Sequence, residues 1–285
     1  MKRILILFIF IAIAGELAAQ SFYKYKRGRD VIANLGTGYS TYFGELKDDG
    51  DYFDPRPNLN IGLQYFFSPR VGARMEATWF KIGGDDAKTN EGGKFKRNLS
   101  FISNNFELNV VGIVQAFPNG VKYYQRSPFN VYGFVGIGFL YFNPKAELNG
   151  KKYALQPIQT EGVSYSRFAI VIPYGIGIKY KLNPFFNIGL EGGFRQTFTD
   201  YLDDVSSTYV DNSSFSNPIH ASLADRSPEI GRSPNEAGTL RGNPSTNDSY
   251  FIMNIKLEFY LPPQILSSFK FNKGRKGPMK RKRRR

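Results

Sequence analysis

The stretch Phe251-Ile-Met-Asn-Ile-Lys-Leu-Glu-Phe-Tyr-Leu261 alternates between two kinds of side chain. Every second residue from Phe251 to Leu261 is apolar, whereas Asn254, Lys256 and Glu258 lie between them. Successive side chains of a β-strand point to opposite faces, so this period of two predicts a strand with one apolar and one polar face.

Seven further stretches upstream show the same period. We expect strands at 33–43, 58–67, 71–79, 105–115, 129–142, 167–181 and 186–198, of which 129–142 is the most apolar throughout. Most of the eight segments have ten or more residues. That is longer than the usual 5–6 residues of strands in soluble sheets and matches the roughly 9–11 residues of a tilted membrane strand.

The connections between these strands alternate in length. Short turns are expected at Ser68–Pro69 and Asn183–Pro184, and Pro118-Asn-Gly120 opens a moderate one. The long loops are 44–56, 83–100, 143–164 and 200–248, and all four fall on one side. Bacterial outer-membrane barrels alternate short periplasmic turns with long extracellular loops. The pattern predicts an all-β fold: an eight-stranded antiparallel transmembrane β-barrel at 30–261, with both termini periplasmic. A periplasmic sandwich or lipocalin-like barrel is the alternative.

The N-terminus resembles an export signal. Lys2 and Arg3 precede an apolar run from Ile4 to Ala14, and small residues precede Gln20. Eleven apolar residues fall short of the roughly 20 that span a bilayer, so we predict a signal peptide at 1–19 rather than an uncleaved anchor helix. A periplasmic segment at 20–29 would follow, and an exported barrel would be integral to a bacterial outer membrane.

The formal net charge of +14 is concentrated at the C-terminus. Residues 270–285 contain ten Lys/Arg and no acid, and residues 20–269 carry only about +3. The basic region therefore belongs to a tail, 262–285, which we expect to be disordered and periplasmic, and not to a folded nucleic-acid-binding patch. The tail and the mature N-terminus would either attach to outer-membrane lipid or dock on an acidic periplasmic partner. The cations predicted to bind that partner are Lys24, Lys26, Arg27, Arg29, Lys270, Lys273, Arg275, Lys276, Lys280, Arg281, Lys282, Arg283, Arg284 and Arg285.

The polar faces of the strands carry equal numbers of bases and acids. The predicted lumen charges are Arg74, Lys179, Arg195 and Lys256 with Glu76, Glu107, Glu191 and Glu258. Side chains can fill an eight-stranded barrel, and a charge buried there needs a partner. We therefore predict a closed, structural charge network and no pore. A catalytic carboxylate pair among the glutamates is the alternative.

The residues offer little for catalysis or cofactors. There is no Cys, which excludes disulfides and thiolate chemistry. The single His220 lies in a polar segment near Asp211, Ser213 and Ser214, but no motif connects them. The pair Asp203–Asp204 would suit a cation, although a solvated loop is the favoured interpretation. We predict no enzyme, no catalytic residue, no cofactor or metal, and neither small-molecule substrate nor nucleic acid.

Four motifs resemble one family. They are Leu35-Gly-Thr-Gly-Tyr-Ser-Thr-Tyr-Phe-Gly-Glu-Leu46, Tyr141-Phe-Asn-Pro-Lys-Ala146, Leu155-Gln-Pro157 with Thr160-Glu-Gly162, and Thr199-Asp-Tyr-Leu-Asp-Asp-Val205. Each resembles a segment of the PorG-like outer-membrane barrels of the type IX (Por) secretion system, and together they span most of residues 30–260. The resemblance implies a non-catalytic outer-membrane component that associates with a periplasmic ring, made of a lipoprotein and its partner. A generic OmpA-like structural barrel or adhesin, and an enzyme at the barrel rim, are the competing hypotheses.

Overall fold

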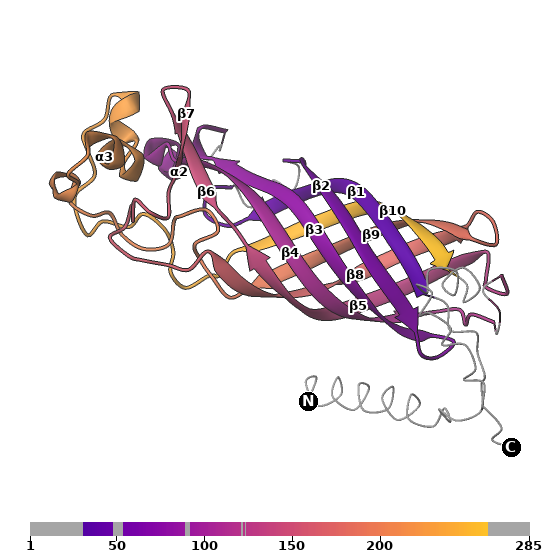
Figure 1. The fold of residues 1–285 in the computed structure, drawn as a ribbon. Coiled ribbons are helices and arrows are strands. Elements are labelled where there is room, and N and C mark those ends of the chain that lie inside the picture. Colours follow the sequence, from indigo (N-terminus) through magenta and orange to yellow (C-terminus); the bar gives the residue numbers. More distant parts are fainter. Residues whose placement is uncertain (1–30, 48–53, 89–91, 121, 123, 262–285) are drawn as a thin grey trace, which may run out of the picture.

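The computed structural model describes residues 31–47, 54–88, 92–120, 122 and 124–261, and eight antiparallel strands in it close a barrel (Figure 1). They are β1 (Val31–Phe43), β2 (Arg56–Phe66), β3 (Val71–Asp85), β4 (Ser100–Gln115), β5 (Phe129–Tyr141), β8 (Phe168–Lys181), β9 (Phe186–Thr197) and β10 (Ser249–Leu261). Each strand pairs with its sequence neighbour, and β10 pairs with β1 to complete the ring. This confirms the predicted fold class.

The two ends of the barrel differ. Short connections join β2 to β3 and β8 to β9 at one end, which we call the turn end. Val31 and Leu261 are paired there, so both ends of the described barrel lie together. The predicted signal peptide, the segment 20–29 and the tail 262–285 lie outside the described residues.

The strands β3 and β4 are longer than the sequence pattern predicted. Their ladder continues to Asp85, opposite Ser100, and shortens the expected loop 83–100. The extension follows from burial, because Phe80, Ile82 and Phe101 pack into an apolar cluster at the end away from the turns. The alternation that marks a half-exposed strand is weaker where both faces are covered.

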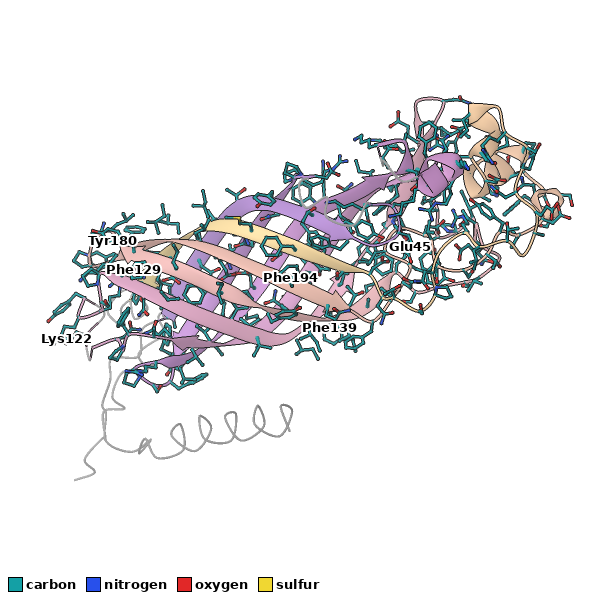
Figure 2. All side chains as sticks on the ribbon, turned by 180° about the vertical axis from the view of Figure 1, so that it is seen from behind. Glu45, Lys122, Phe129, Phe139, Tyr180 and Phe194 are labelled. Carbon is teal, nitrogen blue, oxygen red and sulfur yellow. The ribbon has the colours of Figure 1, made fainter. Side chains whose placement is uncertain are left out.

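The outer face of the barrel is apolar. Exposed outward side chains on every strand include Leu35, Ile61, Met75, Val110, Ile137, Ile176, Leu190 and Ile255. Aromatic rings join them: Figure 2 shows Phe129 and Tyr180 towards the turn end and Phe139 nearer the other end. An outward apolar band with aromatic residues is typical of transmembrane barrels.

Helices do not provide a membrane-crossing segment in the described part of the chain: none there is long and apolar enough to span a bilayer.

The barrel interior has three layers. Near the turn end a buried apolar cluster contains Ile32, Phe66, Ile113, Phe134 and Tyr260. At the opposite end a larger apolar cluster continues from the strands into the loops. On β10 the charged Lys256 and Glu258 lie between Tyr260 of the first cluster and Ile252 of the second. Lys179 lies against Phe66 and Tyr132 of the first cluster. Apolar packing therefore closes the polar layer at both ends.

The long loops fold into a cap over the end opposite the turns, seen in Figure 1 around α2, α3 and β7. The cap consists of the described residues in 44–47, 86–99, 142–167 and 198–248. Its elements are η1 (Asp86–Lys88), α2 (Gly92–Arg97), β6 (Pro144–Leu148), β7 (Lys151–Ala154), η2 (Asn212–Ser214), α3 (Pro218–Ala224) and η3 (Ser227–Ile230). The strand β6 continues the sheet by pairing with β4.

Candidate functional site

Glu191 is the centre of the charge network in the lumen. Arg74 donates to both of its carboxylate oxygens, at 2.7 and 2.9 Å, and Lys256 Nζ lies 2.6 Å from Oε1. The hydroxyl of Tyr132 donates to Oε2 at 2.8 Å. These three donors and the carboxylate come from four different strands, so one buried group connects four sides of the barrel.

The remaining predicted lumen residues are paired around this centre. Lys256 also donates to Glu76 at 2.6 Å. Further along, Arg195 Nε lies 3.6 Å from Glu107, and Lys179 Nζ lies 3.5 Å from Glu258. The structure thus places all eight predicted lumen charges inside the barrel, and each base contacts at least one of the acids.

A fifth inward cation, Arg126, closes the turn end and was not predicted. Its guanidinium lies 4.0 Å from the ring centroid of Tyr260 and donates to Asn187 Oδ1 at 2.9 Å. It also donates to the carbonyl of Pro184 at 2.8 Å. Arg126 belongs to the irregular connection between β4 and β5, where no alternation marks which way a side chain points.

The lumen is arranged for structure. Both oxygens of Glu191 accept hydrogen bonds from charged donors, so the carboxylate is already satisfied. Charges buried this deeply are stable only when paired, and removing one partner leaves the other uncompensated. The arrangement holds the barrel wall together and favours no general base among these glutamates.

At the base of the cap, Tyr42 of β1 lies between two aspartates from distant positions in the chain. Its hydroxyl is 2.7 Å from both Asp203 Oδ2 and Asp248 Oδ1. Asp248 Oδ2 accepts from the backbone N–H of Leu202, and Asp203 Oδ1 accepts from that of Val205. Burial raises the pKa of Asp203 and of Asp248 well above the usual range, and the neighbouring carboxylates add to the shift.

A second cluster in the cap centres on Arg241. Its guanidinium pairs with Glu161 at 2.9 Å and donates to the carbonyl of Asp204. Thr160 and Tyr165 donate to the Asp204 carboxylate. Burial raises the pKa of Asp204 to about 6, although Arg241 opposes the shift.

Arg97 joins α2 to the rest of the cap. It makes two hydrogen bonds to Asp86, at 2.8 and 2.9 Å, and donates to the carbonyls of Glu45 and Arg241. Through Arg97 the loops after β1, β3 and β9 form a single hydrogen-bonded unit. The cap is therefore a folded structure and not a set of independent loops.

The prediction of a solvated loop at Asp203–Asp204 is wrong. Both residues are only 1% exposed, because the hydrogen bonds above and the apolar side chains of Leu202 and Val205 draw this segment into the cap. Oxygens of Glu45, Asp203 and Asp248 lie within 4.8 Å of one another, the one grouping of metal-ligand type in the described part of the chain. Hard cations prefer such carboxylate oxygens, so these residues are the ones that could hold one.

The residues considered for a rim enzyme do not form a catalytic arrangement. His220 lies in α3, next to the η2 segment that contains the two serines, but within the described residues its side chain makes no hydrogen bond to either serine. Asp211 instead caps η2 by accepting from the N–H of Ser213, and Ser214 Oγ donates to the Asp211 carbonyl. The predicted partner-binding cations at 24–29 and 270–285 lie outside the described residues.

The hairpin β6–β7 was missed although the sequence contains its signal. Asn149 and Gly150 form its turn with φ of 52° and 74°. Asn-Gly between two strands is the preferred pair for a two-residue hairpin turn with positive φ. Arg97 and Arg241 carried no comparable signal, because their acidic partners Asp86 and Glu161 lie 11 and 80 positions away in the chain.

Comparison with known proteins gives the following. The family model of the outer membrane protein beta-barrel domain matches residues 4–216. Ail, the attachment invasion locus protein of Yersinia pestis, solved with the heparin analogue sucrose octasulfate, is 11% identical with a TM-score of 0.40, covering 82% of this chain and 99% of its own. Neisserial surface protein A is 9% identical with a TM-score of 0.40, and the match covers 81% of this chain and 96% of that protein. A major outer membrane protein from Thermus thermophilus is 12% identical with a TM-score of 0.42, covering 82% and 99%. No curated protein matches.

Proposed function

The chain belongs to the outer membrane protein β-barrel domain family, and on that premise we propose that it is a non-catalytic outer-membrane component of the type IX secretion machinery. In this proposal the barrel anchors a periplasmic ring, made of a lipoprotein and its partner, to the outer membrane.

The observation that carries the proposal is the meeting of the four PorG-like motifs in one cluster. Tyr42 from the first motif bonds to Asp203 from the last, and Thr160 from the third bonds to Asp204. Phe142 and Ala146 from the second motif pack in the same apolar cluster as Leu155, Leu202 and Val205. All four motifs lie at or beside the long connections at one end of the barrel, and the bonds Tyr42–Asp203 and Thr160–Asp204 join three of them directly. Their meeting supports reading them as the signature of one family.

The orientation follows from the connection lengths. Periplasmic turns of bacterial barrels are short, so the turn end faces the periplasm in this proposal and the cap faces outward. Val31 and Leu261 are paired at the turn end. The N-terminal segment and the basic tail then begin on the periplasmic side, where the ring would lie, and an acidic surface of the ring is the partner we expect for the tail.

A generic structural or surface-binding barrel, in the manner of OmpA-like proteins, is the second candidate. The folded cap favours it, because a cap held by Arg97 and Arg241 presents a defined surface rather than flexible loops. The two candidates place the function at opposite ends of the barrel, which makes them separable.

The test is secretion in a strain that lacks this chain. We expect cargo proteins of the type IX system to accumulate in the periplasm and to return to the medium when the full chain is restored. A restored chain with the ten Lys/Arg of 270–285 replaced by Gln keeps the length of the tail and removes only its charge. Unchanged secretion in the strain without the barrel would overturn the proposal.

A further inference from the structure

A basic cavity lies in the cap between α2 and the long connection from β9 to β10. Its volume is about 440 Å³, and five of the residues that line it are Lys94, Lys96, Arg97, Arg232 and Arg241. No described residue that lines it is acidic. Ligand-binding cavities typically measure about 300–1,000 Å³, so this one is large enough for a small molecule or for one end of a larger one.

Three of the cations around this cavity are held in place by the cap. Arg97 and Arg241 are fixed by ion pairs with the buried acids Asp86 and Glu161. Lys94 Nζ donates to the carbonyl of Lys47 at 2.6 Å, a contact that positions the ammonium group. Two ordered guanidinium groups thus accompany an ordered ammonium group at one wall. Binding loses less entropy when the recognising groups are already ordered.

The remaining two cations, Lys96 and Arg232, are exposed at the mouth of the cavity. Substituting them should therefore leave the packing of the cap intact, which makes them suitable for testing.

Tyr209 adds a polar group that the protein itself does not satisfy. It lines the cavity and is only 5% exposed, yet its hydroxyl has no hydrogen-bond partner among the described residues. Burial raises the pKa of Tyr209 to about 12, so the hydroxyl keeps its proton at neutral pH and can act as a donor. A buried donor without an acceptor destabilises the fold, and a ligand oxygen would remove that destabilisation.

We propose that this cavity binds the phosphate group of a phosphorylated sugar. A phosphate presents several oxygens at high charge density, and the exposed guanidinium of Arg232 can match it in a bidentate manner while Lys96 adds a second positive charge. Phosphate alone is much smaller than the cavity, which leaves room for the sugar beside Leu240, a residue 76% exposed at the same wall. The sugar phosphate is either the headgroup of an outer-leaflet lipid or a soluble molecule. This site is at the opposite end of the barrel from the proposed ring and does not rest on that function.

The first test uses inorganic pyrophosphate and the full chain in detergent micelles, followed by titration calorimetry. We expect one saturable site. The double variant Lys96→Ala/Arg232→Ala should bind at least roughly tenfold more weakly, because it loses two charge-assisted contacts to the phosphate. The matched control is Lys151→Ala/Lys152→Ala, which removes the same charge from exposed positions on β7 outside the cavity and should bind normally.

Tyr209→Phe separates a binding role from a structural one. Because the hydroxyl has no partner among the described residues, its removal should leave the thermal midpoint unchanged or raise it. We expect the same variant to weaken pyrophosphate binding several-fold.

The source of the phosphate is distinguished with nanodiscs. Tighter association of the chain with discs that contain lipid A than with discs that contain its dephosphorylated form indicates the lipid headgroup. Equal association, together with pyrophosphate binding in micelles, indicates a soluble sugar phosphate. The proposal would be overturned if neither pyrophosphate nor lipid A bound saturably. It would also be overturned if Lys96→Ala/Arg232→Ala and Lys151→Ala/Lys152→Ala lost the same affinity for pyrophosphate.

Discussion

At the scale of single residues, the lumen depends on one carboxylate. Glu191→Ala would remove one of the two carboxylates that Arg74 and Lys256 share and leave Glu76 as the one acid facing both cations. Breaking a buried ion pair from one side costs about 3–5 kcal/mol, so we expect a loss of that size in the free energy of unfolding. The measurement is urea unfolding in micelles followed by the fluorescence of Trp79, the single tryptophan.

Glu147→Ala is the matched control for this experiment, because Glu147 is exposed on the hairpin β6–β7. It should change the free energy of unfolding by less than about 0.5 kcal/mol. A Glu191→Ala barrel as stable as the control would contradict a structural role for the lumen charges.

Asp200 makes the stability of the cap depend on pH. Burial, with the nearby charge of Glu45, raises the pKa of Asp200 to about 7 from a usual value of 3.8. The folded cap therefore holds a proton that the unfolded chain has released, and the stabilisation is lost as pH rises from about 4 to about 7. We expect hydrogen exchange in 198–248, corrected for intrinsic rates, to show more opening at pH 8 than at pH 5.

Asp200→Asn removes this buried charge. It should reduce the difference in hydrogen exchange between pH 5 and pH 8, mainly by slowing exchange in the cap at pH 8. Asp204, whose pKa burial raises to about 6, and Asp203 and Asp248, whose pKa values are also raised by burial, leave a remaining dependence of the same sign. A cap that becomes more stable as pH rises over this range would contradict this explanation.

The sequence predicted single residues well in the barrel and poorly in the cap. Alternation places Glu76, Glu191 and Lys256 on the inner face, because a strand has only two faces and one of them is apolar. The partners of Tyr42 in the cap are 161 and 206 positions away in the chain. Contacts of that separation depend on how whole loops fold, and no local period records them.

At the scale of elements, the hairpin β6–β7 should fold independently of the barrel closure. Gly150 has φ of 74°, a conformation in which a Cβ is strained. Gly150→Ala should destabilise the hairpin by roughly 1–2 kcal/mol. Trypsin should then cleave faster at Lys151 and Lys152, while the barrel keeps its heat-modifiable migration on gels, because closure of the eight strands does not involve the hairpin.

Gly112→Ala is the matched control, since an added Cβ on β4 would meet nothing closer than 3.7 Å. It should alter neither readout. If Gly150→Ala lost its heat-modifiable migration on gels, the hairpin would be needed for barrel closure. That result would contradict the independence of the hairpin from the barrel.

Strand number and order could be predicted because eight amphipathic segments with alternating connection lengths have one simple closure. Most strand ends were also predicted within two residues, but the ends of β3 and β4 away from the turns could not be predicted. The ladder of β3 and β4 continues past Gly83 and Gly84. Glycine has no side chain, so the alternation of apolar and polar residues cannot be followed through these two positions. The helices α2 and α3 have 6 and 7 residues, too short for a helical period to stand out from the loops around them.

At the scale of the whole molecule, a barrel closed by apolar clusters at both ends should not conduct ions. We expect the purified chain in a planar bilayer to give no stepwise conductance, because the charged layer between the clusters of Phe134 and of Tyr250 is internally paired. Reproducible steps of uniform size would contradict a closed lumen.

The central claim is that this barrel anchors a periplasmic ring, and affinity purification from outer membranes in mild detergent tests it most directly. The full chain and a chain that stops at Pro263 are purified in parallel, and co-purifying proteins are identified by mass spectrometry. We predict that the full chain retains a periplasmic lipoprotein with its partner and that truncation weakens this association. Two results together would contradict the claim. The full-length barrel would be recovered without partners, and secretion would continue in a strain that lacks the barrel.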